Sequence, residues 1–202
     1  MRTLACILAL LAMTVSAQAQ ERTLIGGADI HGGFGGPVLK YTRINDQDAL
    51  MVGGRGGWIL NHALVLGGGG YGVVNDIDAP PDALPFEPGP LDIEFGYGGF
   101  EMEYVIRPND LVHFSFYTLF GGGANNFVKD VGNVTDSNEQ AGETDFVLVI
   151  EPAVSAEMNV TTWFRLNLGV SYRLVTGVEQ DQLDDSDFSG ASAALTFKFG
   201  TF

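Results

Sequence analysis

Residues 163–175, WFRLNLGVSYRLV, alternate between large apolar side chains and polar or small ones. Successive side chains of a β-strand point to opposite faces of the sheet, so this period of two predicts a strand with one apolar face. The apolar set is Phe164, Leu166, Leu168, Val170, Tyr172 and Leu174, and the opposite set is Arg165, Asn167, Gly169, Ser171 and Arg173.

The same alternation recurs along the chain and predicts eight strands. In residues 91–106 the apolar phase moves by one residue at Gly98-Gly99, which predicts a β-bulge there. Pro152 removes a ladder hydrogen bond within the sixth run and predicts a bulge or bend nearby. The predicted strands are 33–44, 49–59, 63–74, 91–106, 111–122, 144–158, 163–177 and 188–202.

The connections between these runs differ in length. Those near 60–62, 107–110 and 159–162 are short, as is the first, 45–48. Those at 75–90, 123–143 and 178–187 are longer, polar and acidic. Short periplasmic turns and longer external loops are typical of outer-membrane barrels, and an even strand number puts both termini on the periplasmic side. We therefore predict an all-β, eight-stranded, antiparallel, up-and-down transmembrane β-barrel.

The first nineteen residues have the pattern of an export signal. Arg2 precedes an apolar run from Leu4 to Met13, and Ala17-Gln18-Ala19 has the small-x-small form of a cleavage site. The run is too short to span a bilayer. We expect a signal peptide at 1–19 and one barrel domain at 20–202. The only cysteine, Cys6, falls within the leader, so the mature chain is expected to contain no disulfide.

The amino-acid composition limits the classes of partner that we expect for this chain. The chain has 10 basic and 25 acidic residues, a net charge of −15. Nucleic acid is a poor partner for such a chain, because its recognition needs basic patches. No stretch after the leader approaches 18 apolar residues, which excludes a helical membrane span but not a barrel of alternating strands. Gly67-x-Gly69-x-x-Gly72 matches the dinucleotide fingerprint by letter but continues as a strand, so we expect no cofactor.

The final strand reads Leu195-Thr196-Phe197-Lys198-Phe199-Gly200-Thr201-Phe202. With the leader and the strand pattern, the mature chain resembles the small eight-stranded bacterial outer-membrane barrels, the class of the OmpA transmembrane domain and OmpX. The resemblance implies that the protein lies in the outer membrane and that the barrel-assembly machinery reads Phe202 as an insertion signal. Phe202 is out of phase with the outward set Leu195, Phe197 and Phe199. Barrels of this class serve as adhesins, membrane stabilisers and anchors and, less often, as lipid-modifying enzymes.

Glycine-rich segments at 32–37, 53–58 and 67–72 also look like those of uncharacterised exported barrels. Glycines on neighbouring strands allow strong coiling in a narrow barrel and leave room for large side chains opposite them.

The polar faces of the strands carry charges of both signs. We expect a lumenal network of ion pairs, because an eight-stranded barrel is only wide enough to be filled by its own side chains. Such a plug is favoured over an ion path, since pores need more strands. A turn centred near Thr161 would place Glu157 opposite Arg165. The predicted network is Lys40, Arg55, Glu94, Glu101, Glu103, Glu151, Glu157, Arg165, Arg173 and Lys198, with Asp92 on the same face.

His113-x-Ser115 raises the alternative of an enzyme. This pair resembles the catalytic arrangement of outer-membrane lipid A deacylases, and the turn at 107–110 could bring Glu103 opposite His113 to complete a Ser-His-Glu set. However, the phase of Phe114 and Phe116 predicts that His113 and Ser115 face the lumen, away from acyl chains. We therefore expect a non-enzymatic barrel.

A soluble, lipocalin-like periplasmic barrel that binds an apolar ligand is a further alternative. It would place its large side chains inward, and the aromatic residues of eight strands would overfill so narrow a barrel. The sequence alone does not fix the direction of the alternation.

The longer connections are rich in carboxylates, with four or five in each. Such loops can collect calcium or magnesium, and divalent ions bridge the phosphates of lipopolysaccharide. None has the spacing of an EF-hand, so we expect no defined metal site. The expected partners are outer-membrane lipids, including lipopolysaccharide, and divalent cations at the acidic loops.

Overall fold

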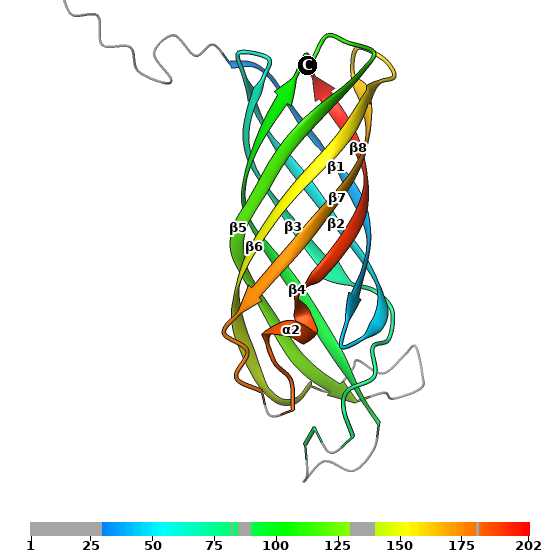
Figure 1. Ribbon diagram of the computed structural model, residues 1–202, viewed down its shortest axis with the longest axis vertical. Helices are drawn as coiled ribbons and strands as arrows, with labels where there is room; N and C mark the ends of the chain where they lie inside the picture. The colour runs from blue at the N-terminus through cyan, green and yellow to red at the C-terminus, as the bar shows by residue number, and fades with distance from the viewer. Residues whose placement is uncertain (1–29, 82, 85–89, 130–139, 181) are drawn as a thin grey trace, which may run out of the picture.

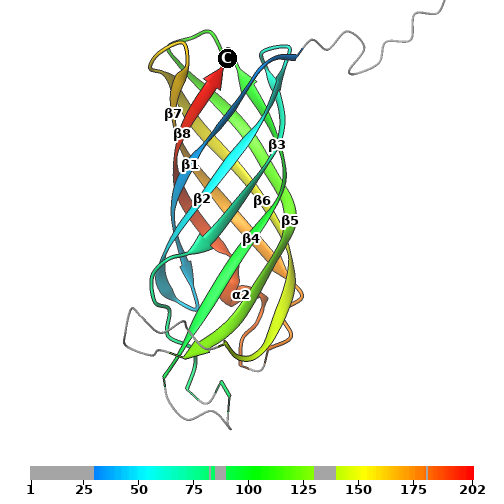
Figure 2. The ribbon, with the colours of Figure 1, turned by 180° about the vertical axis from the view of Figure 1, so that it is seen from behind.

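The computed structural model describes residues 30–81, 83–84, 90–129, 140–180 and 182–202. Each antiparallel strand pairs with the next, and β8 pairs back with β1 to close a barrel (Figures 1 and 2). The predicted signal peptide lies outside the described residues. The strands are β1 (Ile30–Ile44), β2 (Gln47–Leu60), β3 (Leu64–Val73), β4 (Leu91–Ile106), β5 (Val112–Lys129), β6 (Gln140–Asn159), β7 (Phe164–Thr176) and β8 (Gly190–Thr201).

The eight-stranded, up-and-down fold predicted from the sequence is confirmed. The largest difference in strand bounds is at β5 and β6, which extend into the region 123–143 that was predicted to be a loop. Asn125 and Asn126 break the apolar alternation there, yet β5 and β6 stay paired, with a register shift between Asn125 and Phe127. A strand that has left the bilayer needs no apolar outer face, so its pattern no longer reveals it.

The predicted β-bulge at Gly98-Gly99 is wrong. The register of β4 with both neighbours is continuous through these residues. Phe95 and Tyr97 point inward on the same phase as Glu101, and all three are buried. The apolar phase moves because the lumen is apolar near the loops and charged near the periplasmic turns, while the backbone stays regular.

Pro152 likewise causes no register shift. It points outward on β6 and is paired with Thr118 of β5. On the other side, the pairing with β7 stops at Ile150↔Leu174 and resumes at Ala153↔Ser171 in the same register. The missing N–H thus interrupts the ladder locally without bending the strand into a bulge.

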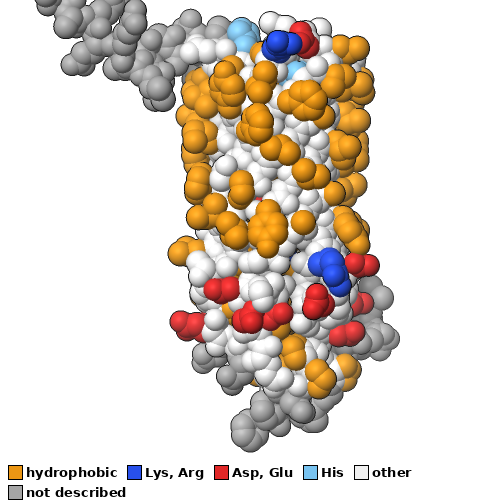
Figure 3. All heavy atoms as spheres, viewed as in Figure 1, with side chains coloured by type: hydrophobic (Ala, Val, Ile, Leu, Met, Phe, Trp, Pro, Cys, Tyr) orange, Lys and Arg blue, Asp and Glu red, His pale blue; other side chains and the backbone are white. Residues whose placement is uncertain are grey.

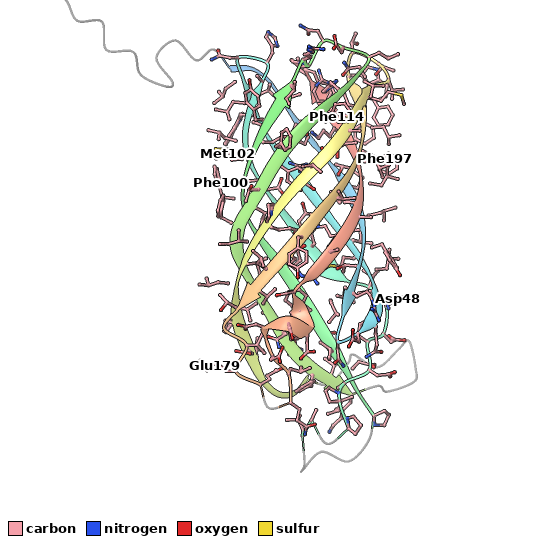
Figure 4. The ribbon with its side chains drawn as sticks, in the orientation of Figure 1. Asp48, Phe100, Met102, Phe114, Glu179 and Phe197 are labelled. Atoms are coloured by element: carbon pink, nitrogen blue, oxygen red, sulfur yellow. The ribbon has the colours of Figure 1, made fainter. Side chains whose placement is uncertain are left out.

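Large apolar side chains cover the outside of the barrel in a broad band (Figure 3). Phe114 is 61% exposed and Phe146 76% exposed, and Phe100 and Met102 point away from the barrel axis (Figure 4). An apolar exterior around a charged interior is the arrangement of a transmembrane barrel. It is the reverse of a soluble barrel, so the lipocalin-like alternative is overturned. Among the described residues, no helix is long and apolar enough to cross a membrane.

The loop end of the lumen is filled by apolar side chains, and four of those that are buried come from the connections: Ile77, Ala83, Leu183 and Phe188. Ile77, before β4, and Phe188, at the end of the short helix α2 (Asp185–Phe188), are fully buried. The Phe188 ring lies 5.0 Å from that of Phe95. The backbone N–H of Asn45 donates to the carbonyl of Asp187, which holds α2 against the β1–β2 turn. These connections therefore contribute to an apolar plug as well as to an acidic surface.

Candidate functional site: the lumenal charge network

A buried ion pair between β1 and β6 lies next to the apolar plug. Lys40 Nζ lies 2.8 and 2.9 Å from the two carboxylate oxygens of Glu151. The hydroxyls of Tyr97 and Ser171 donate to the same carboxylate, at 2.6 and 2.5 Å. Lys40 also lies 3.8 Å above the centre of the Tyr71 ring. The two charges are almost wholly buried, and this many partners offsets the cost of removing them from water.

The middle of the network is centred on Arg55 of β2. Its Nε donates to Glu101 at 2.7 Å and its Nη2 to Glu103 at 3.1 Å, so one guanidinium joins two carboxylates of β4. Arg55 also lies 4.1 Å from the centre of the Tyr117 ring, and Tyr71 donates to Glu101 at 2.7 Å. The planar fork of arginine suits such a junction, because it offers several donors in fixed directions.

At the periplasmic side, Lys198 of β8 joins two further carboxylates. Its Nζ lies 2.9 Å from Glu103 and 2.5 Å from Glu157. Glu157 in turn lies 3.1 Å from Arg165 and 3.2 Å from His113 Nε2. A continuous set of pairs therefore runs from Arg165, near the periplasmic turns, to Arg55 in mid-barrel. These side chains form a plug that is held together by ion pairs.

Phe202 covers the periplasmic end of this network. Its ring stacks on Phe34 with centroids 6.3 Å apart, and the guanidinium of Arg165 lies 4.0 Å from its centre. Phe202 is out of phase with the outward side chains of β8 because it points into the mouth of the barrel. Its predicted role as an insertion signal remains a prediction.

Two of the predicted network residues lie elsewhere. Glu94 is exposed on the outside of the barrel and accepts a hydrogen bond from Asn126. Asp92, on the same phase, is only partly buried. Both were assigned to the lumen because of the β-bulge that the structure does not contain. Arg173 is buried in the lumen, but it donates to the backbone carbonyls of Phe188 and Arg43, at 2.6 and 3.3 Å, and so anchors the apolar plug.

The cross-strand partners also differ from those predicted. Glu157 is opposite Asn167, and Glu103 is opposite Tyr117. Glu157 reaches Arg165 diagonally across the β6–β7 pair, because long side chains span the distance to a neighbour two residues away.

The three residues of the enzyme alternative do not form a catalytic relay. Ser115 donates to Glu103 at 2.6 Å and lies 2.8 Å from the Ser155 hydroxyl. His113 contacts Glu157 and the backbone carbonyl of Asp110 instead. A relay needs the histidine between the serine and the acid, so that it can take the serine proton. All three side chains are buried in the lumen, behind the wall of the barrel.

Several members of the network were missed from the sequence. The tyrosines were overlooked as partners of charge, and Tyr97 was placed on the apolar phase that was expected to face lipid. On β6 and β7 the usable signal is parity, because Ser155, Asn167 and Ser171 share the odd positions of the charged residues. On β3, which carries Tyr71, there is no charged residue to follow. The missed members are Tyr71, Tyr97, Tyr117, Ser155, Asn167 and Ser171.

We expect Glu157→Leu to lower the unfolding midpoint more than Arg165→Leu does. Glu157 holds Lys198 as well as Arg165, whereas the side chain of Arg165 is 12% exposed and can still reach water. Denaturant unfolding of refolded protein in lipid vesicles measures both, and the double variant should recover part of the Glu157→Leu loss. Strictly additive losses would show that the two residues are not coupled.

The rim at the loop end is acidic. Its exposed carboxylates include those of Asp48 and Glu179, labelled in Figure 4, and a belt of Asp and Glu borders the apolar band in Figure 3. The hydroxyl and backbone N–H of Ser186 donate to Asp184 and lower the pKa of its carboxyl, so this cap of α2 stays charged. Within the described part of the chain, no three His, Cys, Asp or Glu residues are placed to hold a metal ion.

No protein-family model and no curated protein matches this sequence. Among solved structures, Neisserial surface protein A (NspA) is 14% identical, with a TM-score of 0.52, and the match covers 87% of this chain and 98% of that one. OprG from Pseudomonas aeruginosa is 9% identical, with a TM-score of 0.48, over 86% of this chain and 97% of that one. Ail, the attachment invasion locus protein of Yersinia pestis, is 13% identical, with a TM-score of 0.42, over 84% and 96%.

The likeness to NspA is one of fold alone, that of a small β-barrel. The apolar band, the charged lumen and the arrangement of turns and loops agree with it. The chain is an eight-stranded β-barrel of the outer membrane.

Proposed function

We propose that the protein is a non-enzymatic, non-conducting barrel that acts through its acidic external rim, in a structural or surface-interaction role. The observation that carries this proposal is the filling of the lumen. Apolar side chains occupy its loop end, and ion pairs joined by Arg55 and Lys198 occupy the rest. The working surface is then the outside of the protein, and its most distinctive part is the rim.

Conduction provides the first test. Because buried side chains block both halves of the lumen, planar-bilayer recordings of the pure protein should show no large, steady open state. Reproducible nanosiemens steps would contradict the plug.

Lipid chemistry provides the second test. With Ser115 bonded to Glu103 inside the barrel, lipid A should have the same mass in cells with and without the gene. An acyl chain that is lost when the intact gene is present, and retained in a Ser115→Ala strain, would establish the hydrolase alternative.

The rim suits partners bridged by divalent cations. Lipopolysaccharide phosphates and rim carboxylates repel each other, and calcium or magnesium, which prefer oxygen ligands, can join them. Binding of purified lipopolysaccharide to the barrel in detergent micelles should therefore need millimolar divalent ion and be lost on adding EDTA. It should weaken in a variant that neutralises the exposed Asp46, Asp76 and Glu179. If that variant bound lipopolysaccharide as well as the wild type does, the rim would not be the binding surface.

The barrel-assembly machinery is the proposed partner during insertion, with the last strand and Phe202 as the segment it reads.

A further inference from the structure

The lipid-facing wall carries a groove over β1, β2 and β3, the strands seen side by side in Figure 2. Its floor is a row of glycines that face outward on adjacent strands: Gly35 is opposite Gly56, and Gly56 is opposite Gly68. Since none of them has a side chain, the floor is bare backbone. The groove is open toward the lipid and has a volume of about 560 Å³, within the range of small-molecule sites.

Aromatic side chains form the walls of the groove. Phe199 is opposite Gly35 on one side, and Phe100 is opposite Gly68 on the other, so the row across five strands runs Phe, Gly, Gly, Gly, Phe. Trp58, 66% exposed, stands in the next row toward the periplasm. In the opposite direction the next row is again glycine, with Gly54 opposite Gly70.

Trp58 locates the groove in the membrane. It lies two residues before the end of β2, next to a periplasmic turn, and tryptophan is enriched where the bilayer meets water. Within the described part of the chain its indole N–H has no hydrogen-bond partner, so it can donate to a lipid ester or phosphate. The groove therefore begins at the periplasmic interface and runs into the hydrocarbon.

We propose that this groove binds one acyl chain of a phospholipid from the periplasmic leaflet. The occupant is apolar, because the groove lies in the apolar band and the backbone of its floor is paired within the sheet. A second copy of the protein fits less well. A two-fold interface would bring the same concave row of glycines against itself and leave a gap. Lipopolysaccharide lies in the opposite leaflet, at the loop end.

At Gly56 and Gly68 a Cβ atom would meet the carbonyl oxygens of Phe34 and Gly99 at 2.7 and 2.9 Å, so strand packing accounts for those two glycines of the floor. Gly35 is different, because packing does not require a glycine there. A Cβ atom at Gly35 would have no neighbour within 4 Å, so the barrel could hold a side chain there. Glycine inside a strand costs stability relative to alanine. The bare floor at this position thus keeps space open for an external occupant.

The test is native mass spectrometry of the mature protein, refolded in vesicles that contain palmitoyl-oleoyl phosphatidylethanolamine and released in mild detergent. The wild-type monomer should retain one phospholipid. Gly35→Leu should fill the groove and lower the retained fraction several-fold. Gly72→Leu is the matched control: Gly72 also faces outward and has open space around its Cβ position, but it lies outside the groove, so retention should not change.

Trp58→Ala, which removes a wall, should also lower retention and serves if Gly35→Leu does not fold. A heat-dependent shift on electrophoresis checks folding of each variant. A wild-type monomer without lipid, a lipid-free dimer, or equal retention by the folded groove variants and Gly72→Leu would each overturn the proposal. In EDTA, which removes the cations that the rim needs, the same protein offered lipopolysaccharide alone should retain none. Lipopolysaccharide that is retained in EDTA and lost in Gly35→Leu would overturn the assignment to a phospholipid.

Discussion

Glu103→Leu should cause the largest loss of stability of any single charge removal in the lumen. Glu103 is fully buried and accepts hydrogen bonds from Arg55, Lys198 and Ser115. Its removal leaves Lys198 with Glu157 alone and Arg55 with Glu101 alone, in an interior that water enters poorly. Breaking a buried ion pair from one side costs about 3–5 kcal/mol. Denaturant unfolding in lipid vesicles should show a loss in this range.

The matched control is Glu94→Leu, the same change on the same strand at an exposed position outside the barrel. Its effect should stay within about 0.5 kcal/mol, as for ordinary surface substitutions. Adding Lys198→Leu to Glu103→Leu should recover part of the loss, because a stranded charge is removed as well. Equal losses from Glu103→Leu and Glu94→Leu would mean that the lumenal pairs do not hold the barrel together.

Gly36→Ala should be the most damaging of the conservative glycine substitutions on β1. Gly36 faces inward, and the carbonyl oxygen of Phe197 on β8 occupies the place that a Cβ atom would take. The two strands would have to separate at the seam that closes the barrel, with a loss of about 3 kcal/mol, the upper end of the range for overpacking. Unfolding midpoints and the yield of folded protein measure the effect.

Gly35→Ala is the control for this prediction. Its Cβ meets nothing, and alanine restricts the unfolded chain, so stability should stay the same or rise by about 0.4–1 kcal/mol. Equal effects at the two neighbouring positions would show that strand closeness does not explain the glycines of this barrel.

The fold could be predicted from the sequence because the bilayer imposes a strict pattern on each strand. The alternation at 163–175 marks β7, and the same parity separates the apolar exterior from Arg165 and Arg173. The narrow width of an eight-stranded barrel predicted a lumen filled with charged side chains. The structure buries four of the predicted residues there: Lys40, Arg55, Glu151 and Lys198. Alternation does not say which face of a strand points into the barrel, and the structure shows that the charged face does.

The false β-bulge, the misplaced Glu94 and the overlooked plug residues have one common cause. A polar inner face was expected along the whole length of the barrel, whereas the loop end is apolar, with Phe95, Tyr97 and Phe188 inside. This produced a false β-bulge at Gly98-Gly99, misplaced Glu94, and hid the contribution of Ile77 and Phe188 to the plug. The alternation of apolar and polar residues reports which strand positions face lipid. It does not predict how a connection folds back into the mouth of the barrel.

Electrophoresis of purified outer membranes, with and without boiling, tests the central claim most directly, because it reports location and barrel closure together. A closed barrel resists detergent until it is heated, so the mature protein should be found in the outer-membrane fraction, with unboiled and boiled samples migrating differently. Recovery as a soluble periplasmic protein, with the same mobility before and after boiling, would contradict the account.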